Sequence, residues 1–110
     1  MTIKELETWI KQVRFQNEKV TFSNSFDVEY ETDEDYINVS FNYDFKKNRF
    51  ECGVSIYHAS EDNNAENVEA HTDEYDYHDD NLSSLVLKVA DELGDDFTKA
   101  FNSDLEKAVI

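Results

Sequence analysis

The histidines of this chain lie among carboxylates, a combination that could bind a divalent cation. The densest set comprises His71, Asp73, Asp76 and His78, and imidazole and carboxylate groups are common metal ligands. The spacing of these four residues, however, matches no established ligand pattern. A solvated acidic loop explains the set better, so the sequence predicts neither a metal site nor any other cofactor.

Candidate nucleophiles are few. The single cysteine, Cys52, falls on the apolar side of a predicted strand, where a buried structural thiol is expected rather than a reactive thiolate. Ser83 and Ser84 are not in a nucleophile-elbow sequence. The only two glycines, Gly53 and Gly94, cannot build a phosphate-binding loop. We therefore predict no catalytic residues and expect that the protein is not an enzyme.

Negative charge is the dominant feature of the sequence. The 110 residues include 26 acids and 10 bases, which give a formal net charge of −16. Residues 27–80 carry seventeen of the acids against three bases, whereas both ends of the chain are nearly neutral. Selection for solubility, or adaptation to high salt, would spread acids over the whole surface. Their concentration in the middle favours a localised acidic patch that faces a basic partner.

One stretch spaces its acids regularly, at every second residue from Asp27 to Asp33. In a strand such side chains point the same way and lie about 6.7 Å apart. DNA presents a comparable line of phosphates to basic grooves. The alternative is that these acids are only the solvated side of an amphipathic strand. The full set predicted to bind a partner is Asp27, Glu29, Glu31, Asp33, Glu34, Asp35, Glu51, Glu61, Asp62, Glu66, Glu69, Asp73, Glu74, Asp76, Asp79 and Asp80.

Hydrophobic periodicity predicts the elements that position these acids. Thr2 and Glu5 form a capping box, and apolar residues then repeat at helical spacing, which predicts a helix over 2–15. Alternation of apolar and polar residues predicts three strands. They cover 20–31, with a bend at Asn24–Ser25, 37–44 and 50–57.

The rest of the chain predicts a loop and two helices. Residues 59–80 contain nine acids and no Lys or Arg, which favours a loop, although 68–72 could form a fourth, edge strand. Asn81 or Ser83 can cap one helix that Gly94 ends, and Asp95 or Asp96 can cap another. We therefore predict a single α+β domain over 1–110. Its N-terminal helix precedes an antiparallel sheet of three or four strands, and its two C-terminal helices pack on one face of that sheet.

In charge and in the order of its elements, the chain resembles small acidic inhibitors from phages and mobile elements that imitate DNA. This class includes anti-restriction and anti-CRISPR proteins. The resemblance implies that carboxylates near Asp27–Asp35 and Glu61–Asp80 occupy the DNA-binding groove of a basic nuclease or another DNA-binding protein. It also implies that the chain does not itself bind nucleic acid.

Two other functions fit the same sequence. One is an immunity protein that neutralises a basic nuclease toxin, and the other is a small secretion-type chaperone, which would need an apolar groove or a dimer surface. The single cysteine and an N-terminus without an apolar run predict a cytoplasmic protein, in the host bacterium if a phage encodes it. No stretch of the sequence is expected to bind or cross a membrane.

Overall fold

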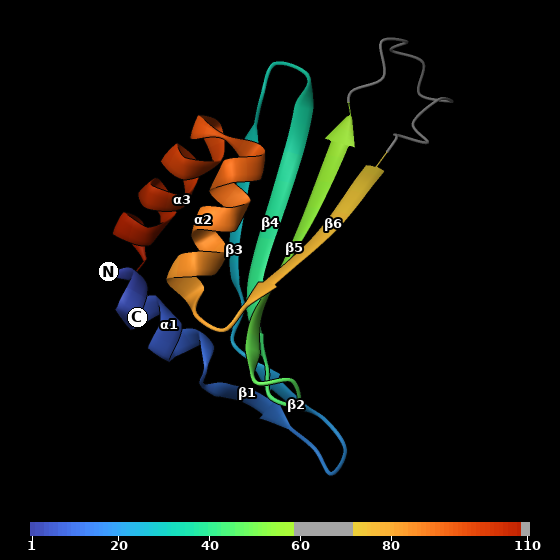
Figure 1. Cartoon of the computed structure of the whole chain (residues 1–110), viewed down its shortest axis with the longest axis vertical. Helices are drawn as coiled ribbons and strands as arrows, with labels where there is room; N and C mark the ends of the chain where they lie inside the picture. The colour runs from blue at the N-terminus through green and yellow to red at the C-terminus, as the bar shows by residue number, and fades with distance from the viewer. Residues whose placement is uncertain (59–71, 109–110) are drawn as a thin grey trace.

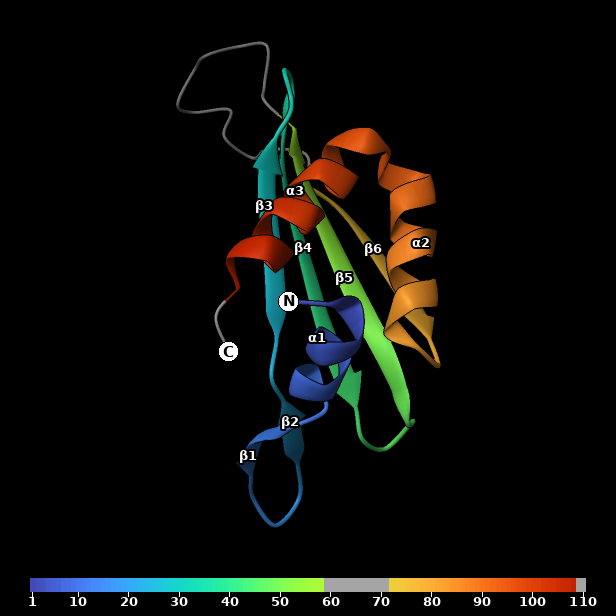
Figure 2. The same ribbon diagram turned by 90° about the vertical axis from the view of Figure 1, so that its left-hand side faces the viewer.

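The computed structural model describes residues 1–58 and 72–108, which form three helices, a four-stranded antiparallel sheet and a two-stranded hairpin. In chain order the elements are α1 (Ile3–Ile10), β1 (Val13–Gln16), β2 (Thr21–Ser23), β3 (Phe26–Glu31), β4 (Asp35–Asp44), β5 (Arg49–His58), β6 (Thr72–Asp79), α2 (Leu82–Leu93) and α3 (Asp95–Lys107). The larger sheet has the order β3-β4-β5-β6, and the helices lie on one of its faces (Figure 1, Figure 2). The predicted α+β class is confirmed.

The core lies between this sheet and the helices, and strand alternation builds it. On β4, Val39 and Phe41 point toward the helices and are fully buried, whereas Asn38 and Ser40 point away, because successive side chains of a strand face opposite sides. The same alternation buries one side of β3 and β5. From the helix layer, Phe97 of α3 packs against Phe41 with ring centroids 6.3 Å apart.

Side chains cap α1 and α2 as the sequence predicts, but the cap expected for α3 from Asp95 or Asp96 is wrong, because α3 begins after Gly94 without a side-chain cap. Thr2 Oγ1 accepts a hydrogen bond from the Glu5 backbone N–H, and Glu5 Oε1 accepts one from the Thr2 N–H, which completes the capping box of α1. Asn81 caps α2 by accepting a hydrogen bond from the Ser84 N–H at 2.8 Å. Gly94 ends α2 at a φ of +84°, a conformation that favours glycine.

Two predictions about the N-terminal region are wrong. The helix expected over 2–15 ends at Ile10, and the chain then enters strand β1. The strand expected over 20–31 is two strands, β2 and β3, which belong to different sheets. Asn24 fixes the break between them, because its side chain donates to the Trp9 carbonyl at 2.9 Å and its backbone N–H donates to the Gln12 carbonyl at 3.2 Å.

The acidic segment expected to be a loop contains strand β6. This strand pairs antiparallel with β5 over eight residues, so the larger sheet has four strands. The predicted fourth strand at 68–72 overlaps β6 only at Thr72, and residues 59–71 lie outside the described part of the chain. An edge position explains how β6 can be so acidic, because water reaches it from the side as well as from the face.

Candidate functional site

We call the face of the larger sheet that is turned away from the helices the open face. Strand register aligns its residues in rows across the four strands, and Glu29, Asn38, Ser55 and Glu74 form one such row. The whole face consists of Asp27, Glu29 and Glu31 on β3, Tyr36, Asn38, Ser40, Asn42 and Asp44 on β4, Arg49, Glu51, Gly53, Ser55 and Tyr57 on β5, and Thr72, Glu74, Asp76 and His78 on β6.

Carboxylates line both edges of the open face. On β3, Asp27, Glu29 and Glu31 are exposed and follow one another at about 6.7 Å along the strand. On β6, Glu74 and Asp76 are also exposed and point to the same side. Because neighbouring strands are about 4.8 Å apart, the two edges are about 14 Å apart. The open face therefore has two acidic edges, which we call the β3 edge and the β6 edge.

Short, uncharged side chains cover the middle of the two central strands between these edges. Asn38 and Ser40 lie on β4, and Gly53 and Ser55 lie on β5 in register with them. A Cβ added at Gly53 would meet only the Asp76 carboxylate, at 3.9 Å, so nothing stands above the sheet at this position. The middle of the open face is therefore a neutral floor between two negative edges.

Two of the edge carboxylates, Asp27 and Glu29, are hydrogen bonded to neutral neighbours. Ser25 Oγ donates to Asp27 Oδ1 at 3.0 Å, and Asn38 Nδ2 donates to Glu29 Oε1 at 3.1 Å. A hydrogen bond to the Glu29 carboxylate also raises the pKa of Tyr36. Within residues 1–58 and 72–108, none of the five edge carboxylates forms an ion pair. Their charge is therefore available to a cationic partner.

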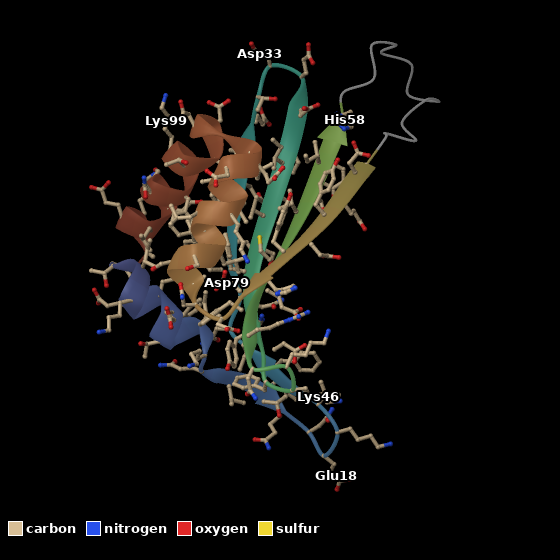
Figure 3. All side chains as sticks on the ribbon, viewed as in Figure 1. Glu18, Asp33, Lys46, His58, Asp79 and Lys99 are labelled. Atoms are coloured by element: carbon tan, nitrogen blue, oxygen red, sulfur yellow. The ribbon has the colours of Figure 1, made fainter. Side chains whose placement is uncertain are left out.

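The β3 edge continues into the turn between β3 and β4, where Asp33 (labelled in Figure 3) and its neighbour in sequence, Glu34, add two acids. A pocket of about 350 Å³ lies beside this turn and is lined by both acids and by Tyr36 and Tyr57. The two tyrosine rings have centroids 5.8 Å apart. Aromatic rings beside carboxylates suit a guanidinium group, which can stack and form ion pairs at once.

Two acids from the predicted binding set, Asp35 and Asp73, lie on the helix side of the sheet. Both contact His58, whose Nδ1 is 2.8 Å from Asp35 Oδ1 and whose Nε2 is 2.7 Å from Asp73 Oδ2. The hydrogen bond to Asp73, and then the one to Asp35, raise the pKa of His58. This cluster connects β4, β5 and β6 at one end of the sheet, so its acids are positioned to support the fold.

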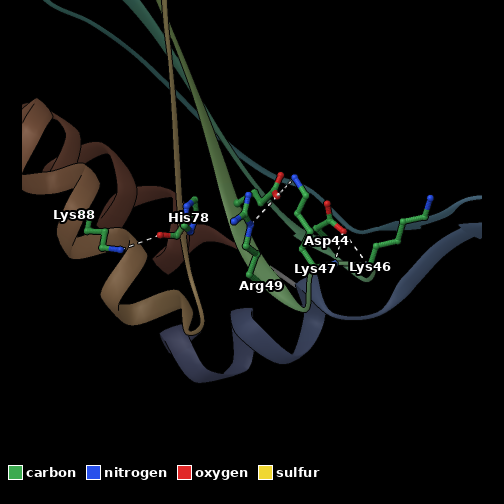
Figure 4. A network of polar contacts seen from close by, with 7 residues as sticks. Asp44, Lys46, Lys47, Arg49, His78 and Lys88 are labelled. Atoms are coloured by element: carbon green, nitrogen blue, oxygen red, sulfur yellow. Dashed lines mark hydrogen bonds and ion pairs between the residues drawn. The ribbon is translucent and has the colours of Figure 1, made fainter.

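Glu51 and Asp79, also in the predicted set, are ion paired within the chain. Glu51 Oε1 lies 3.1 Å from Arg49 Nε on the same strand. Asp79 Oδ2 lies 2.9 Å from Lys88 Nζ of α2, and this hydrogen bond is the main cause that lowers the pKa of Asp79. Lys88 also donates to the carbonyl of His78, which ties α2 to β6 (Figure 4).

The remaining predicted residues lie at the end of β6 or outside the described part of the chain, as does His71 of the candidate metal set. Asp80 follows β6 and is exposed, whereas Glu61, Asp62, Glu66 and Glu69 lie outside the described residues. Asp73 and Asp76 face opposite sides of β6, because they are three residues apart in a strand. Among the residues that the structure describes, no group of three or more His, Cys, Asp or Glu could hold a metal ion.

A second surface was not predicted at all. The hairpin of β1 and β2 borders a groove of about 850 Å³ at the end of the larger sheet, lined in part by Phe15, Val20, Phe22 and Arg14. Val20 and Phe22 were expected to face the core, but they are 40% and 52% exposed, because the hairpin extends beyond the sheet (Figure 1). The chaperone hypothesis needs an apolar groove of this kind, and a chaperone function stays a prediction.

Comparison with known proteins finds no matching family model, no significantly similar characterised protein and no significantly similar solved structure. None of the helices in the described residues is long and apolar enough to span a bilayer.

Proposed function

We propose that this protein is an inhibitor whose open face occupies the DNA-binding groove of a basic protein, such as a nuclease, in place of DNA. The observation that carries the proposal is the pair of acidic edges without ion pairs on either side of a neutral floor. A sheet that needed only a solvated side could carry Ser, Thr, Lys and Asn there, without the mutual repulsion that unpaired carboxylates cause.

The dimensions of the open face support this proposal. Two lines of negative charge about 14 Å apart are comparable to two phosphate backbones on either side of a major groove about 12 Å wide. Within the β3 edge, the spacing of about 6.7 Å is close to twice the rise of about 3.4 Å per nucleotide along one DNA strand. A groove that binds phosphates with Lys and Arg therefore meets carboxylates at similar intervals.

Charge alone would give a weak complex, because exposed ion pairs contribute between 0 and about 1 kcal/mol each. Tyr36 and Tyr57 supply the aromatic surface that a stable interface also needs. Both rings are on the open face, in the same row as Glu31 of the β3 edge. An arginine of the partner would thus contact rings and carboxylates together, and an arginine of this kind is a common source of binding energy.

The test is affinity capture from host-cell lysate with the purified protein, followed by competition with duplex DNA and a salt series. We expect a basic DNA-binding protein that duplex DNA displaces and that is lost at high salt, because its Lys and Arg side chains contact carboxylates. The variant D27N/E29Q/E31Q/D33N should fold with unchanged or higher stability and should not capture this protein.

A matched control changes the same number of charges elsewhere. D91N/E92Q/D95N/E106Q removes four exposed acids on the helix side and should capture the partner as the wild type does. Equal capture by both variants, or a partner that DNA cannot displace, would contradict DNA mimicry. A single toxin that is held tightly whether or not DNA is present would support the immunity-protein alternative.

A further inference from the structure

The groove beside the hairpin of β1 and β2 has an apolar, largely aromatic lining. Phe15, Val20 and Phe22 line it and are 54%, 40% and 52% exposed. The rings of Phe15 and Phe22 are paired across the two strands, with centroids 6.0 Å apart. Tyr43 and Phe45 also line the groove, with ring centroids 5.2 Å apart. Exposed apolar groups that cluster in this way mark interaction surfaces.

Three cations line the same groove without an anionic partner in the described chain. Arg14 and Lys19 come from the hairpin region, and Lys46 comes from the turn between β4 and β5. All three residues are exposed, and within residues 1–58 and 72–108 none of them forms an ion pair. Figure 3 shows that Lys46 lies at the end of the molecule opposite to Asp33. We call Arg14, Lys19 and Lys46 the unpaired cations.

Two carboxylates also line the groove, but both have partners of their own. Asp44 Oδ1 accepts hydrogen bonds from the backbone N–H groups of Lys46 and Lys47, at 2.9 Å and 3.0 Å. The bond from Lys47 is the main cause that lowers the pKa of Asp44. Glu51 Oε1 lies 3.1 Å from Arg49 Nε and 4.0 Å from Lys47 Nζ. The charge of Glu51 is thus balanced by its neighbours, and the three unpaired cations outweigh Asp44.

The charge of the groove decides which ligand fits it. A basic segment would be repelled by the unpaired cations, and a second copy that presented the same end would bring the same cations and be repelled as well. An acidic segment is attracted. At physiological ionic strength charges separated by more than about 8 Å are largely screened, so a ligand in the groove interacts with the unpaired cations more than with the distant acids of the Asp33 turn.

An acidic peptide fits the groove better than a single-stranded nucleic acid, although bases stack on aromatic rings in such grooves. Every nucleotide carries a phosphate, so a nucleic acid strand would place phosphates beside Asp44 as well as beside the cations. A peptide can place a carboxylate beside Arg14 or Lys46 and a neutral residue beside Asp44. The aliphatic side chain of Val20 also suits an apolar side chain better than the flat face of a base.

We propose that the hairpin groove binds an acidic peptide segment of another protein, in which Glu or Asp residues flank aromatic or aliphatic residues. The carboxylates of the segment pair with the unpaired cations, and its apolar side chains cover Phe15 and Phe22. Asn42, Asp44 and Glu51 line the groove and also belong to the open face, so the peptide site adjoins that face. The inference does not rest on the proposed function, because it uses none of the edge carboxylates.

Isothermal titration calorimetry with a synthetic peptide tests the proposal. The probe is a decapeptide of glutamates with two phenylalanines, and the matched probe has glutamine in place of every glutamate. We expect the acidic probe to bind, and the neutral probe to bind about tenfold more weakly. R14Q/K19Q/K46Q should also weaken binding of the acidic probe about tenfold. The control K4Q/K99Q/K107Q changes three exposed lysines of α1 and α3 and should bind as the wild type does.

A second pair of variants tests the apolar contact. F15A should weaken binding of the acidic probe about tenfold, whereas L87A, at a 66% exposed position on α2, should not. The charge variant keeps every apolar side chain of the hairpin, so it tests the groove even if F15A disturbs the hairpin itself. Backbone amide shifts measured during the titration should change in β1, β2 and the β4–β5 turn, and should stay constant in α3.

Several results would overturn a peptide site. One is an acidic probe that does not bind, and another is equal affinity for the acidic and neutral probes. Equal binding by R14Q/K19Q/K46Q and by its control would have the same meaning. An oligothymidine strand that binds more tightly than the acidic probe would assign the groove to nucleic acid. A dimer of the free protein that F15A abolishes, measured by sedimentation equilibrium, would assign the groove to a second copy. Each of these two assignments would refute the proposal.

Discussion

Replacing Tyr30 with phenylalanine should stabilise the protein. Tyr30 is on the helix side of β3, and its ring packs edge-on against Phe97 with centroids 6.5 Å apart. Its hydroxyl oxygen is buried without a hydrogen-bond partner in the described structure. Desolvation, together with the nearby Asp96 carboxylate, raises the pKa of Tyr30 to about 12. Y30F removes the buried hydroxyl and keeps the ring contact.

The expected gain follows from two opposing terms. A buried polar group without a partner costs about 1–3 kcal/mol. The void that the oxygen leaves, roughly 15 Å³ or half the volume of a water molecule, costs about 0.4 kcal/mol at about 24 cal/mol per Å³. Y30F should therefore raise the free energy of unfolding by about 0.6–2.6 kcal/mol. For a chain of 110 residues, with a shift of about 4 °C per kcal/mol, Tm should rise by about 2–10 °C.

Urea and thermal unfolding of Y30F and of Y75F measure this effect. Tyr75 is 46% exposed, so removal of its hydroxyl should leave the free energy of unfolding unchanged. Above pH 10 the difference in free energy of unfolding between Y30F and the wild type should widen. In the unfolded wild type Tyr30 ionises near pH 10, whereas in the folded state it resists ionisation up to about pH 12. A Y30F variant that is no more stable than the wild type would show that the hydroxyl has a partner in solution and would refute the reasoning.

Three further predictions concern single positions. Asp73 and Asp35 raise the pKa of His58, so protonated His58 contributes its full stabilisation below pH 6.5. This contribution is lost as the pH rises through the pKa of His58 in the folded state. H58Q should therefore remove this part of the pH dependence of Tm. Burial raises the pKa of the Cys52 thiol to about 12, so a thiol reagent should modify it only as fast as the protein unfolds. G94A should lower the free energy of unfolding by about 1 kcal/mol or more, measured by urea titration, because alanine disfavours the φ of +84°.

Local patterns were sufficient for the parts of the fold that pack against one core. Alternation on β4 and β5 and the helical spacing on α2 are directly visible in the sequence, because each element buries one continuous apolar side. In the hairpin the same patterns occur, but the apolar side chains are exposed. Val13 follows the apolar spacing of α1, and Val20 and Phe22 alternate as core residues do. They are exposed because Asn24 separates β2 from β3, a contact with the distant Trp9 that no local pattern encodes.

Only the part of the candidate site that depends on a local pattern could be predicted from the sequence. The line of Asp27, Glu29 and Glu31 requires only the period of one strand. The β6 edge requires pairing between β5 and β6, and the His58 cluster requires contacts 15 and 23 residues away. Alternation of Tyr75 and Tyr77 with acids was the available signal for β6, but the high charge of the segment favoured a loop.

The alternation that divides the larger sheet into a core side and an open face also separates two kinds of evolutionary constraint. Core residues such as Val39 and Phe41 are fixed by packing, whereas surface substitutions usually change stability by less than about 0.5 kcal/mol. A lineage can therefore change the open face one residue at a time without losing the fold. The same separation makes the domain a scaffold for selection, in which Asn38, Ser40 and Ser55 can be randomised to retarget it.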